Sequence, residues 1–414
     1  MDSGRTSFHC HRSAMRESLY TSPYQRRKLM PCETVRCAVV GLVQGLEDVY
    51  TTLHHPRYTL VAVCDQNPQR WRWLTGEEDV DKVDESAALF PHHKEWVRES
   101  RKAAGFADVE YLPDFDDVLA RDDIDAVILV LPDLLHAEYA IKALEAGKYV
   151  LSTKPTARTL DEAFAIAESA RQHPNHFMLG FQVSYSGFAT AVREVIATGE
   201  IGTPRQLRFD FDRGPWRPVH RKKYAEVDGS MIKEGVHWLD MIYRLSGELP
   251  WRAIAGFGGQ ETFPDDFEFE DSGVLIIDYP GFRAAHTFSY FRQPLTRSED
   301  FLLIGDKGTI RGTFEQFAVE TDAGTRTIVP TTSPLPAQYH NGYYEMADAF
   351  AAAVLDGIEP YTNWRTGLEN MLTCHAAQVA VAGNTMVTRE SLADLDWRVK
   401  FGQETSSAAQ LIEA

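Results

Sequence analysis

The stretch Val35-Arg36-Cys37-Ala38-Val39-Val40-Gly41-Leu42-Val43-Gln44-Gly45-Leu46 decides the fold. It begins as a short apolar run, typical of a strand buried on both faces of a parallel sheet, and it ends in a turn with two glycines. Residues 47–53 favour a helix, and residues 58–64 are a second apolar run. Strand, glycine turn, helix and strand together make a βαβ unit.

The same alternation continues further along the chain. Two more apolar strands are expected at 125–132 and 149–152, with a helix between them at 135–146. Strands that alternate with helices predict a parallel sheet covered on both faces. The fold class is therefore α/β, and residues 35–155 are expected to form an N-terminal Rossmann domain, a doubly wound parallel sheet.

Beyond about Tyr185 the sequence changes to longer strands of alternating character, which predicts a mostly antiparallel sheet. The expected strands are 205–211, 272–279, 282–290, 301–304 and 309–313, and the expected helices are 187–198, 230–245, 343–355 and 366–381. Residues 156–403 are thus expected to form a C-terminal α/β domain with a large open sheet, whose last helices are free to pack back on the Rossmann domain.

The composition excludes several classes of protein. The 414 residues are 44% hydrophobic and 25% charged, as in a globular protein. A net charge of −18 would repel a nucleic acid backbone. Five scattered cysteines indicate neither disulfides nor a zinc site, and the histidine pairs at 54–55 and 92–93 lack a carboxylate at ligand spacing, so no metal is expected.

No apolar run is long enough to cross a membrane, and the first 34 residues lack the apolar core of a secretory signal. We therefore expect a cytoplasmic protein. Residues 1–34, rich in Arg and Ser, are expected to be a disordered extension, and residues 404–414 a flexible tail. A transit peptide is the alternative for the first segment, and Met30 is an alternative start.

The glycine turn indicates a dinucleotide site. Its pattern is an imperfect G-x-G-x-x-G, because Val43 stands at the second glycine position and Gly45 is displaced by one residue from the third. Gly41, Val43, Gln44 and Gly45 are the expected pyrophosphate contacts. Asp65 ends the second strand, where a carboxylate binds the adenosine ribose and repels a 2′-phosphate, so NAD is favoured. Arg70 keeps NADP open.

Two further segments carry a family resemblance. Residues 131–138 read LPDLLHAE, and residues 143–155 read ALEAGKYVLSTKP. They resemble the P-N-x-x-H segment, the A-L-x-A-G-K-x-V run and the E-K-P signature of the glucose–fructose oxidoreductase/inositol dehydrogenase (Gfo/Idh/MocA) family. The likeness extends over about residues 35–387, through the GVHWLD segment at 235–240 and the GDKGTI segment at 305–310.

The resemblance implies an oxidoreductase that acts on a secondary alcohol of a sugar, sugar derivative or cyclitol, with a C-terminal sheet that forms a homodimer or homotetramer. It implies catalytic roles for Lys154 and His237. The cofactor contacts that it implies are Leu131, Pro132, His136, Lys154 and Pro155. The chemistry agrees, because hydride leaves an alcohol only as its proton is removed, which requires a base such as histidine and favours a nearby cation.

The sequence departs from the family pattern at three positions. Thr153 replaces the glutamate of E-K-P, and Ser184 stands where many relatives have an arginine. Lys233 replaces the aspartate four residues before His237, which makes Lys233 a further catalytic candidate and Glu234 the substitute carboxylate. On an α-helix, Lys233 would share a face with His237 and lower its pKa. The expected substrate contacts are Tyr185, Trp216, Lys233, Glu234 and His237.

Three functions remain open on the sequence. The first is an NAD(P)-dependent sugar or cyclitol dehydrogenase. The second is an NAD-dependent enzyme that cleaves glycosides by transient oxidation and elimination. The third is a nucleotide-binding regulator without turnover.

Overall fold

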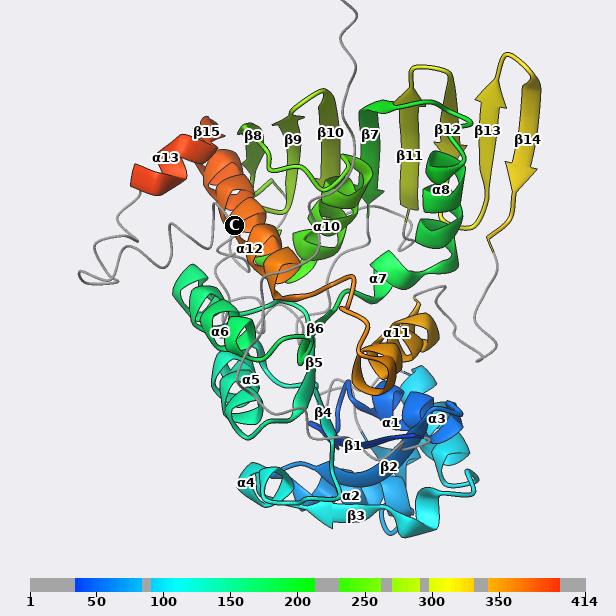
Figure 1. Ribbon diagram of the computed structural model, residues 1–414, viewed down its shortest axis with the longest axis vertical. Helices are drawn as coiled ribbons and strands as arrows, with labels where there is room; N and C mark the ends of the chain where they lie inside the picture. The colour runs from blue at the N-terminus through cyan, green and yellow to red at the C-terminus, as the bar shows by residue number, and fades with distance from the viewer. Residues whose placement is uncertain are drawn as a thin grey trace, which may run out of the picture. The chain divides into compact units, whose positions relative to one another are not determined.

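The structure is a computed structural model that describes residues 34–83, 91–212, 231–261, 270–290, 298–330 and 342–394. Apart from Thr34, the expected N-terminal extension lies outside these residues, as do the expected C-terminal tail and Trp216. The described residues contain two sheets with helices packed against them (Figure 1).

The first sheet has six strands in the order β3-β2-β1-β4-β5-β6, and all of its neighbouring strands are parallel. The strands are β1 (Val35–Val40), β2 (Tyr58–Cys64), β3 (Glu110–Leu112), β4 (Ala126–Leu129), β5 (Tyr149–Thr153) and β6 (Phe177–Gly180). The strand order reverses between β1 and β4. The predicted Rossmann sheet is confirmed. Open α/β sheets bind ligands at the carboxyl ends of the strands, beside the point where the strand order reverses.

The first domain extends beyond residue 155, where the sequence pattern placed its end. Strand β6 pairs in parallel with β5, and helix α6 (Leu160–Gln172) connects the two. The hydroxyl oxygen of Thr159 accepts from the backbone N–H of Glu162, and the backbone N–H of Thr159 donates to the carboxylate of Glu162. This capping box starts α6. The expected boundary is therefore too early, because a helix and a strand of the first sheet follow it.

Helices cover both faces of the first sheet. Along β1, Cys37 and Val39 join a core with α1 (Leu46–His54) and α11 (Tyr343–Asp356), whereas Ala38 and Val40 join the core on the opposite face. That second face carries α5 (His136–Glu145), α6 and α12 (Trp364–Gly383). Helices α11 and α12 are the last long helices in the sequence, and both pack on the first domain.

The second sheet has nine strands in the order β14-β13-β12-β11-β7-β10-β9-β8-β15, and only its β7–β10 pair is parallel among the described strands. Its strands are β7 (Pro204–Asp212), β8 (Ala253–Gly259), β9 (Ser272–Tyr279), β10 (Phe282–Ser289), β11 (Ser298–Gly305), β12 (Gly308–Gly312), β13 (Phe317–Thr321), β14 (Gly324–Ile328) and β15 (Met386–Thr388). The mostly antiparallel sheet is confirmed.

Helices also pack on one face of this second sheet, and α12 contacts both β8 and β9. The remaining α-helices are α2 (Pro68–Thr75), α3 (Pro91–Ser100), α4 (Phe115–Leu119), α7 (Gln182–Tyr185), α8 (Gly187–Ala197), α10 (Val236–Leu245) and α13 (Arg389–Asp394). On the face of the sheet that points away from the core, Phe257, Val274 and Ile276 are 63%, 44% and 47% exposed.

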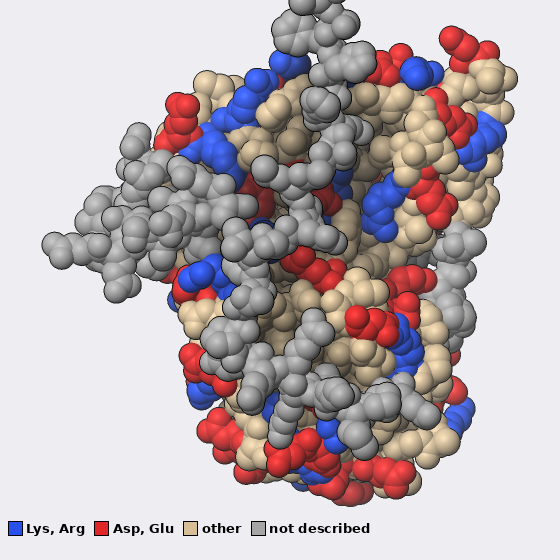
Figure 2. Space-filling view, in the orientation of Figure 1, with Lys and Arg blue, Asp and Glu red and all other residues tan. Residues whose placement is uncertain are grey.

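Acidic side chains are frequent at the lower end of the view in Figure 2, where β3 and α4 lie in Figure 1. Exposed acids in or beside α4 are Asp114, Asp116, Asp117, Asp122 and Asp123. Within the described ranges, no helix combines the length and the apolar character needed to cross a membrane.

Candidate functional site

The turn after β1 requires both of its glycines. Gly41 has a φ of +93°, and a Cβ atom there would lie 2.1 Å from the carbonyl oxygen of Val130. A Cβ atom at Gly45 would lie 2.1 Å from the carbonyl oxygen of Gly41. Gly45 directly precedes α1, and no side chain caps this helix. The turn therefore leads into a helix N-terminus whose N–H groups are suited to bind a pyrophosphate.

Two acids occupy the first turn of α1. Burial raises the pKa of Asp48 to about 7, and burial also raises the pKa of Glu47 well above its usual range, although the hydroxyl of Tyr343 bonds to Glu47 and opposes the shift. Both carboxyl groups are thus shifted toward their neutral forms. This reduces the repulsion that they would exert on a phosphate at the end of the helix.

Asp65 lies where the sequence places the ribose-binding acid, and its carboxylate is well ordered by neighbours. The backbone N–H of Leu42 donates to Oδ2 at 2.7 Å, and that of Asn67 donates to Oδ1 at 2.8 Å. Arg70 donates from Nη1 to both oxygens. The carboxylate therefore ties the glycine turn to the end of β2, and Arg70 covers both of its oxygens.

The other expected cofactor contacts lie at the carboxyl ends of adjacent strands. Val43 and Gln44 follow β1, Leu131 and Pro132 follow β4, and Pro155 follows β5. Gln44 and Pro132 are exposed, Val43 and Leu131 are half-buried, and Pro155 is buried. The structure brings the three segments to one edge of the sheet.

His136 lies buried between the segments that follow β4 and β5. Its ring is fully buried, with Nδ1 2.7 Å from the carbonyl oxygen of Pro155 and Nε2 3.0 Å from that of Leu131. Burial lowers the pKa of this histidine. Because both ring nitrogens face main-chain oxygens, the ring fixes two loops in relation to each other, which differs from the expected contact with the nicotinamide.

Lys154 reaches across from the first domain to the second. Its Nζ donates to the main-chain carbonyl of Lys233 at 2.8 Å, and it lies 3.8 Å from Oε1 of Glu234. Lys233 and Glu234 belong to the turn that leads into α10, the helix that carries His237. Lys154 and the segment of His237, which are far apart in sequence, therefore meet at the carboxyl edge of the first sheet.

The segment before His237 is not the regular α-helix that the sequence pattern assumed. Met231–Gly235 forms a π-helical turn, and α10 begins at Val236. The i, i+4 stacking of Lys233 on His237 therefore does not apply, because a π-turn rotates successive side chains differently. Nζ of Lys233 instead lies 2.5 Å from Oδ2 of Asp133, which follows β4.

Asp133 is a site residue that the sequence reasoning missed. It lies within the quoted LPDLLHAE segment, but no role was assigned to it. Its side chain is only 9% exposed and its partner Lys233 is 20% exposed. The signal that could have found it is its position directly after a buried strand of the parallel sheet.

His237 lies on the first turn of α10 and is 7% exposed. Its ring is near those of Phe181 and Trp238, with centroids 6.4 and 6.0 Å away. These two aromatic rings and the burial of His237 limit the access of water to its ring.

Tyr185 does not join this group. Its hydroxyl lies 3.1 Å from Oγ1 of Thr362 and accepts from the backbone N–H of the same residue. Burial raises the pKa of Tyr185 to about 12. The structure thus places the hydroxyl in a buried contact between α7 and the loop before α12, rather than beside Lys154.

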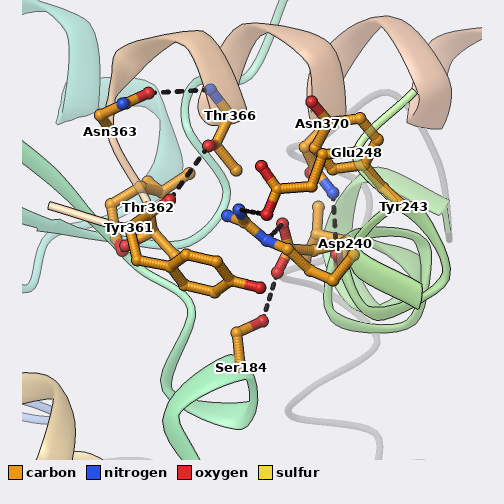
Figure 3. Close-up of polar contacts among 12 residues, drawn as sticks. Ser184, Asp240, Tyr243, Glu248, Tyr361, Thr362, Asn363, Thr366 and Asn370 are labelled. Carbon is orange, nitrogen blue, oxygen red and sulfur yellow. Dashed lines mark hydrogen bonds and ion pairs between the residues drawn. The ribbon is translucent and has the colours of Figure 1, made fainter. Parts of the chain in front are cut away.

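A second polar cluster contacts α10 through Asp240 (Figure 3). The hydroxyl of Ser184 donates to Asp240, whose other oxygen lies 3.4 Å from Nε of Arg244. Arg244 also pairs with Glu248 at 2.8 Å and lies over the ring of Tyr361, 3.7 Å from its centroid. Asp240 follows His237 by one helical turn, so this cluster holds the histidine-bearing helix in place.

Metal-binding chemistry has no candidate in the part of the chain that the structure describes. There, no group of three or more His, Cys, Asp or Glu side chains is arranged to hold a metal ion. Cys37, Cys64 and Cys374 are buried free thiols.

The comparisons with known proteins agree with this geometry. Residues 35–181 match the family described as "Oxidoreductase family, NAD-binding Rossmann fold", and residues 189–311 match the "GFO/IDH/MocA C-terminal domain". The chain belongs to the Gfo/Idh/MocA family of oxidoreductases, and its first domain is an NAD-binding Rossmann domain. The first match ends directly after β6, in agreement with the sheet.

Two curated relatives illustrate the similarity. A dTDP-3,4-didehydro-2,6-dideoxy-alpha-D-glucose 3-reductase of Streptomyces violaceoruber is 33% identical over 165 residues, which cover 39% of this chain and 47% of the relative. A 2,7-anhydro-N-acetylneuraminate hydratase of Mediterraneibacter gnavus is 27% identical over 221 residues, which cover 49% and 55%. The chain spans about half the length of these relatives.

A solved structure shows the same fold over most of the chain. Levoglucosan dehydrogenase in complex with NADH and levoglucosan superimposes with a TM-score of 0.69 at 19% identity, and covers 86% of this chain and 99% of that chain. The two-domain architecture is therefore shared.

Proposed function

We propose that this protein is an NAD-dependent dehydrogenase that transfers a hydride between the nicotinamide and a secondary alcohol of a sugar, sugar derivative or cyclitol. The observation that carries the proposal is the 2.8 Å contact of Lys154 with the turn that leads into His237, at the edge of the sheet that also bears the glycine turn. The similarity to a sugar reductase and to the fold of levoglucosan dehydrogenase supports a carbohydrate substrate.

We infer that the cofactor lies across the β1–β4 switch point. The N-terminus of α1 would receive the pyrophosphate, and Asp65 would accept hydrogen bonds from the ribose hydroxyls. The remaining contacts would come from Gly41, Val43, Gln44, Gly45, Leu131, Pro132, Lys154 and Pro155. The bound nicotinamide accepts or returns the hydride.

His237 and Lys154 would divide the work on the alcohol. His237 accepts the hydroxyl proton as the hydride leaves, and returns it in the reverse direction. The ammonium of Lys154 stabilises the negative charge that develops on the same oxygen. Glu234, whose Oε1 lies 3.8 Å from Nζ of Lys154, is the carboxylate available to hold neighbouring hydroxyls.

The proposal is tested by mixing the full chain with NAD⁺ and a panel of cyclitols, hexoses, uronates and glycosides, and following the absorbance of NADH with analysis of products. We expect net NADH and a ketone product from at least one polyol. Lys154→Met and His237→Asn should each lower kcat by about 10²-fold or more, as loss of acid–base or charge stabilisation does.

The same variants should leave the NADH dissociation constant within about threefold of the parent value, because Lys154 is proposed to meet only the nicotinamide end and neither side chain holds the pyrophosphate or the adenosine. Lys142→Met, on the exposed face of α5, serves as the control and should not change turnover. A fully active Lys154→Met/His237→Asn protein would refute the assigned site. Tight NADH binding without turnover of any compound in the panel would instead favour a nucleotide-binding regulator.

A second candidate has one observation in its favour, the similarity to a 2,7-anhydro-N-acetylneuraminate hydratase. In this alternative the same alcohol oxidation is transient and activates a neighbouring C–H bond for elimination, and hydride is returned within the cycle. Cleavage of a glycoside or anhydrosugar without accumulation of NADH would favour it over a net dehydrogenase.

We further infer a homodimer or homotetramer formed through the outer face of the second sheet. Phe257 pairs with Val274 across β8 and β9, and Ile276 lies two residues further along β9. Their combined exposure gives this face an apolar patch over β8 and β9, toward the β15 edge of the sheet.

A further inference from the structure

Two ion pairs of opposite polarity join the π-helical turn to the first domain. In one pair, the carboxylate oxygen Oδ2 of Asp133 on the first domain lies 2.5 Å from Nζ of Lys233 on the turn. In the other pair, Nζ of Lys154 on the first domain lies 3.8 Å from Oε1 of Glu234 on the turn. The two members on the turn are adjacent in sequence, and the two members on the sheet follow neighbouring strands, β4 and β5.

Lys233 contacts both Asp133 and Lys154 of the first domain, but through different atoms. Its amine binds the carboxylate of Asp133, and its main-chain carbonyl accepts from Nζ of Lys154. The direction of that carbonyl depends on where the π-turn lies, and the ion pair with Asp133 holds the turn in place. The position of the Lys154 amine is therefore coupled to the Asp133–Lys233 pair.

Both members of this pair are mostly withdrawn from solvent, at 9% and 20% exposed. Removal of one partner from such a pair leaves the other charge poorly solvated, so the remaining side chain moves toward water. If Lys233 moved, its backbone turn would shift with it, and the hydrogen bond to Lys154 would lengthen.

We propose that Lys233 is a positioning residue. Its ion pair with Asp133 holds the Met231–Gly235 turn against the first domain and thereby sets the position of the Lys154 amine. This inference rests on the proposed function, because Lys154 is there the group that faces the reacting oxygen. It assigns a role to Asp133 and replaces a direct catalytic role for Lys233.

The test measures the chemical reactivity of Lys154, which requires neither cofactor nor substrate. The full chain is acetylated briefly with acetic anhydride, and modification of Lys154 is quantified by mass spectrometry relative to Lys82, whose side chain is 83% exposed. Asp133→Asn and Lys233→Gln should each raise the labelling rate of Lys154 at least threefold. The charge-swapped double variant Asp133→Lys/Lys233→Asp should restore it to within twofold of the parent.

Arg389→Gln is the matched control. It breaks the Arg389–Glu369 ion pair, whose distance of 2.7 Å and side-chain exposures of 21% and 13% are similar to those of the Asp133–Lys233 pair. This variant should leave Lys154 labelling unchanged. Lys233→Arg, which keeps the charge, should also stay close to the parent and shows that loss of the pair, rather than any change at this position, exposes Lys154.

Turnover provides the second readout once a substrate is found. The single variants should lower kcat at least tenfold with less than a threefold change in KM, and the swapped variant should recover part of kcat. Unchanged Lys154 labelling in Asp133→Asn would overturn the proposal, as would a swapped variant as reactive as the single ones. A higher KM for Lys233→Gln with Lys154 still protected would show instead that Lys233 binds the substrate. Because labelling needs no turnover, these outcomes stand apart from failure of the proposed activity.

Discussion

Arg70 donates from one guanidinium nitrogen to both carboxylate oxygens of Asp65, at 3.1 and 2.8 Å. In the cofactor site that we propose, the pair would lie at the position where NAD and NADP differ. The charge of Asp65 opposes a 2′-phosphate, and its carboxylate engages the Arg70 guanidinium that could bind one, so we expect tighter binding of NADH than of NADPH. Fluorescence titration of the two reduced cofactors measures this difference.

Asp65→Ser should reverse the preference, because it removes the repelling carboxylate and frees Arg70 to bind the phosphate. We expect the ratio of the NADPH and NADH dissociation constants to change by about tenfold or more in favour of NADPH. Adding Arg70→Ala to this variant should remove the gain. A parent protein that binds both cofactors equally would contradict the expectation.

Gly41→Ala should disrupt the dinucleotide turn. The residue would keep a φ of +93° that alanine adopts poorly, and its Cβ would lie 2.1 Å from the carbonyl oxygen of Val130. We expect at least about 2 kcal/mol less free energy of unfolding in urea, and NADH binding weakened by tenfold or more. Gly105→Ala is the control, since a Cβ there meets no atom within 4 Å. Equal stability of the two variants would argue against the strained turn.

Asp48→Asn should change the pH dependence of stability. Burial raises the pKa of Asp48 from its ordinary value of 3.8 to about 7, so between these values the folded protein binds a proton that the unfolded chain has lost. The free energy of unfolding therefore falls as the pH rises from about 4 to 7, and this loss persists above pH 7. Asparagine cannot ionise, so the variant does not suffer it.

We expect Asp48→Asn to be more stable than the parent at pH 8, by at most roughly 4 kcal/mol, and to lose this advantage near pH 4. Urea unfolding at both pH values provides the measurement. A stability difference that is the same at pH 4 and pH 8 would mean that ionisation of Asp48 is not its cause.

Phe257→Glu should separate the proposed oligomer into monomers. The substitution places a charge at the centre of the apolar patch formed with Val274 and Ile276, and burial of an unpaired carboxylate in an interface is strongly unfavourable. Light scattering coupled to size-exclusion chromatography gives the mass. Val329→Glu, at a residue that is 69% exposed just beyond β14, is the control and should not alter the mass. An unchanged oligomer in Phe257→Glu would locate the interface elsewhere.

The sequence predicted the elements whose local pattern is strong. Strands β1, β2, β4 and β5 are short apolar runs because they are largely buried on both faces, and Gly41 and Asp65 mark the ends of β1 and β2. The long strands β9 and β10 alternate in character because one face packs on the core and the other meets solvent. Such periodicity is visible without any knowledge of tertiary contacts.

Strand β8 shows why other elements were missed. Its sequence AIAGFGG contains three glycines, which are unfavourable in strands. Helix α12 packs so closely on it that a Cβ at Gly256 would lie 2.8 Å from the backbone nitrogen of Val381, and one at Gly258 would lie 2.3 Å from the side chain of Val381. The glycines are explained by a helix more than 100 residues away, which no local pattern reveals.

The site was only partly predictable, because some of its contacts join residues that are far apart in the sequence. Lys154 and His237 were proposed from motifs, and the structure places Lys154 against the segment that carries His237. Their catalytic roles stay predictions. The partner of Lys233 was not found, because Asp133 lies 100 residues away. The π-helical turn also has no sequence signature in the pattern used, so an α-helical spacing was assumed and the direction of Lys233 was wrong.

Helices α11 and α12 have a consequence for biosynthesis. They complete the cover of a sheet whose six strands all lie before residue 181, yet they are made only after residue 342. While the ribosome is synthesising the second sheet, the first one still displays apolar side chains that await Phe350 and its neighbours. The nascent chain therefore completes the cover of its first sheet only after the second sheet has been made.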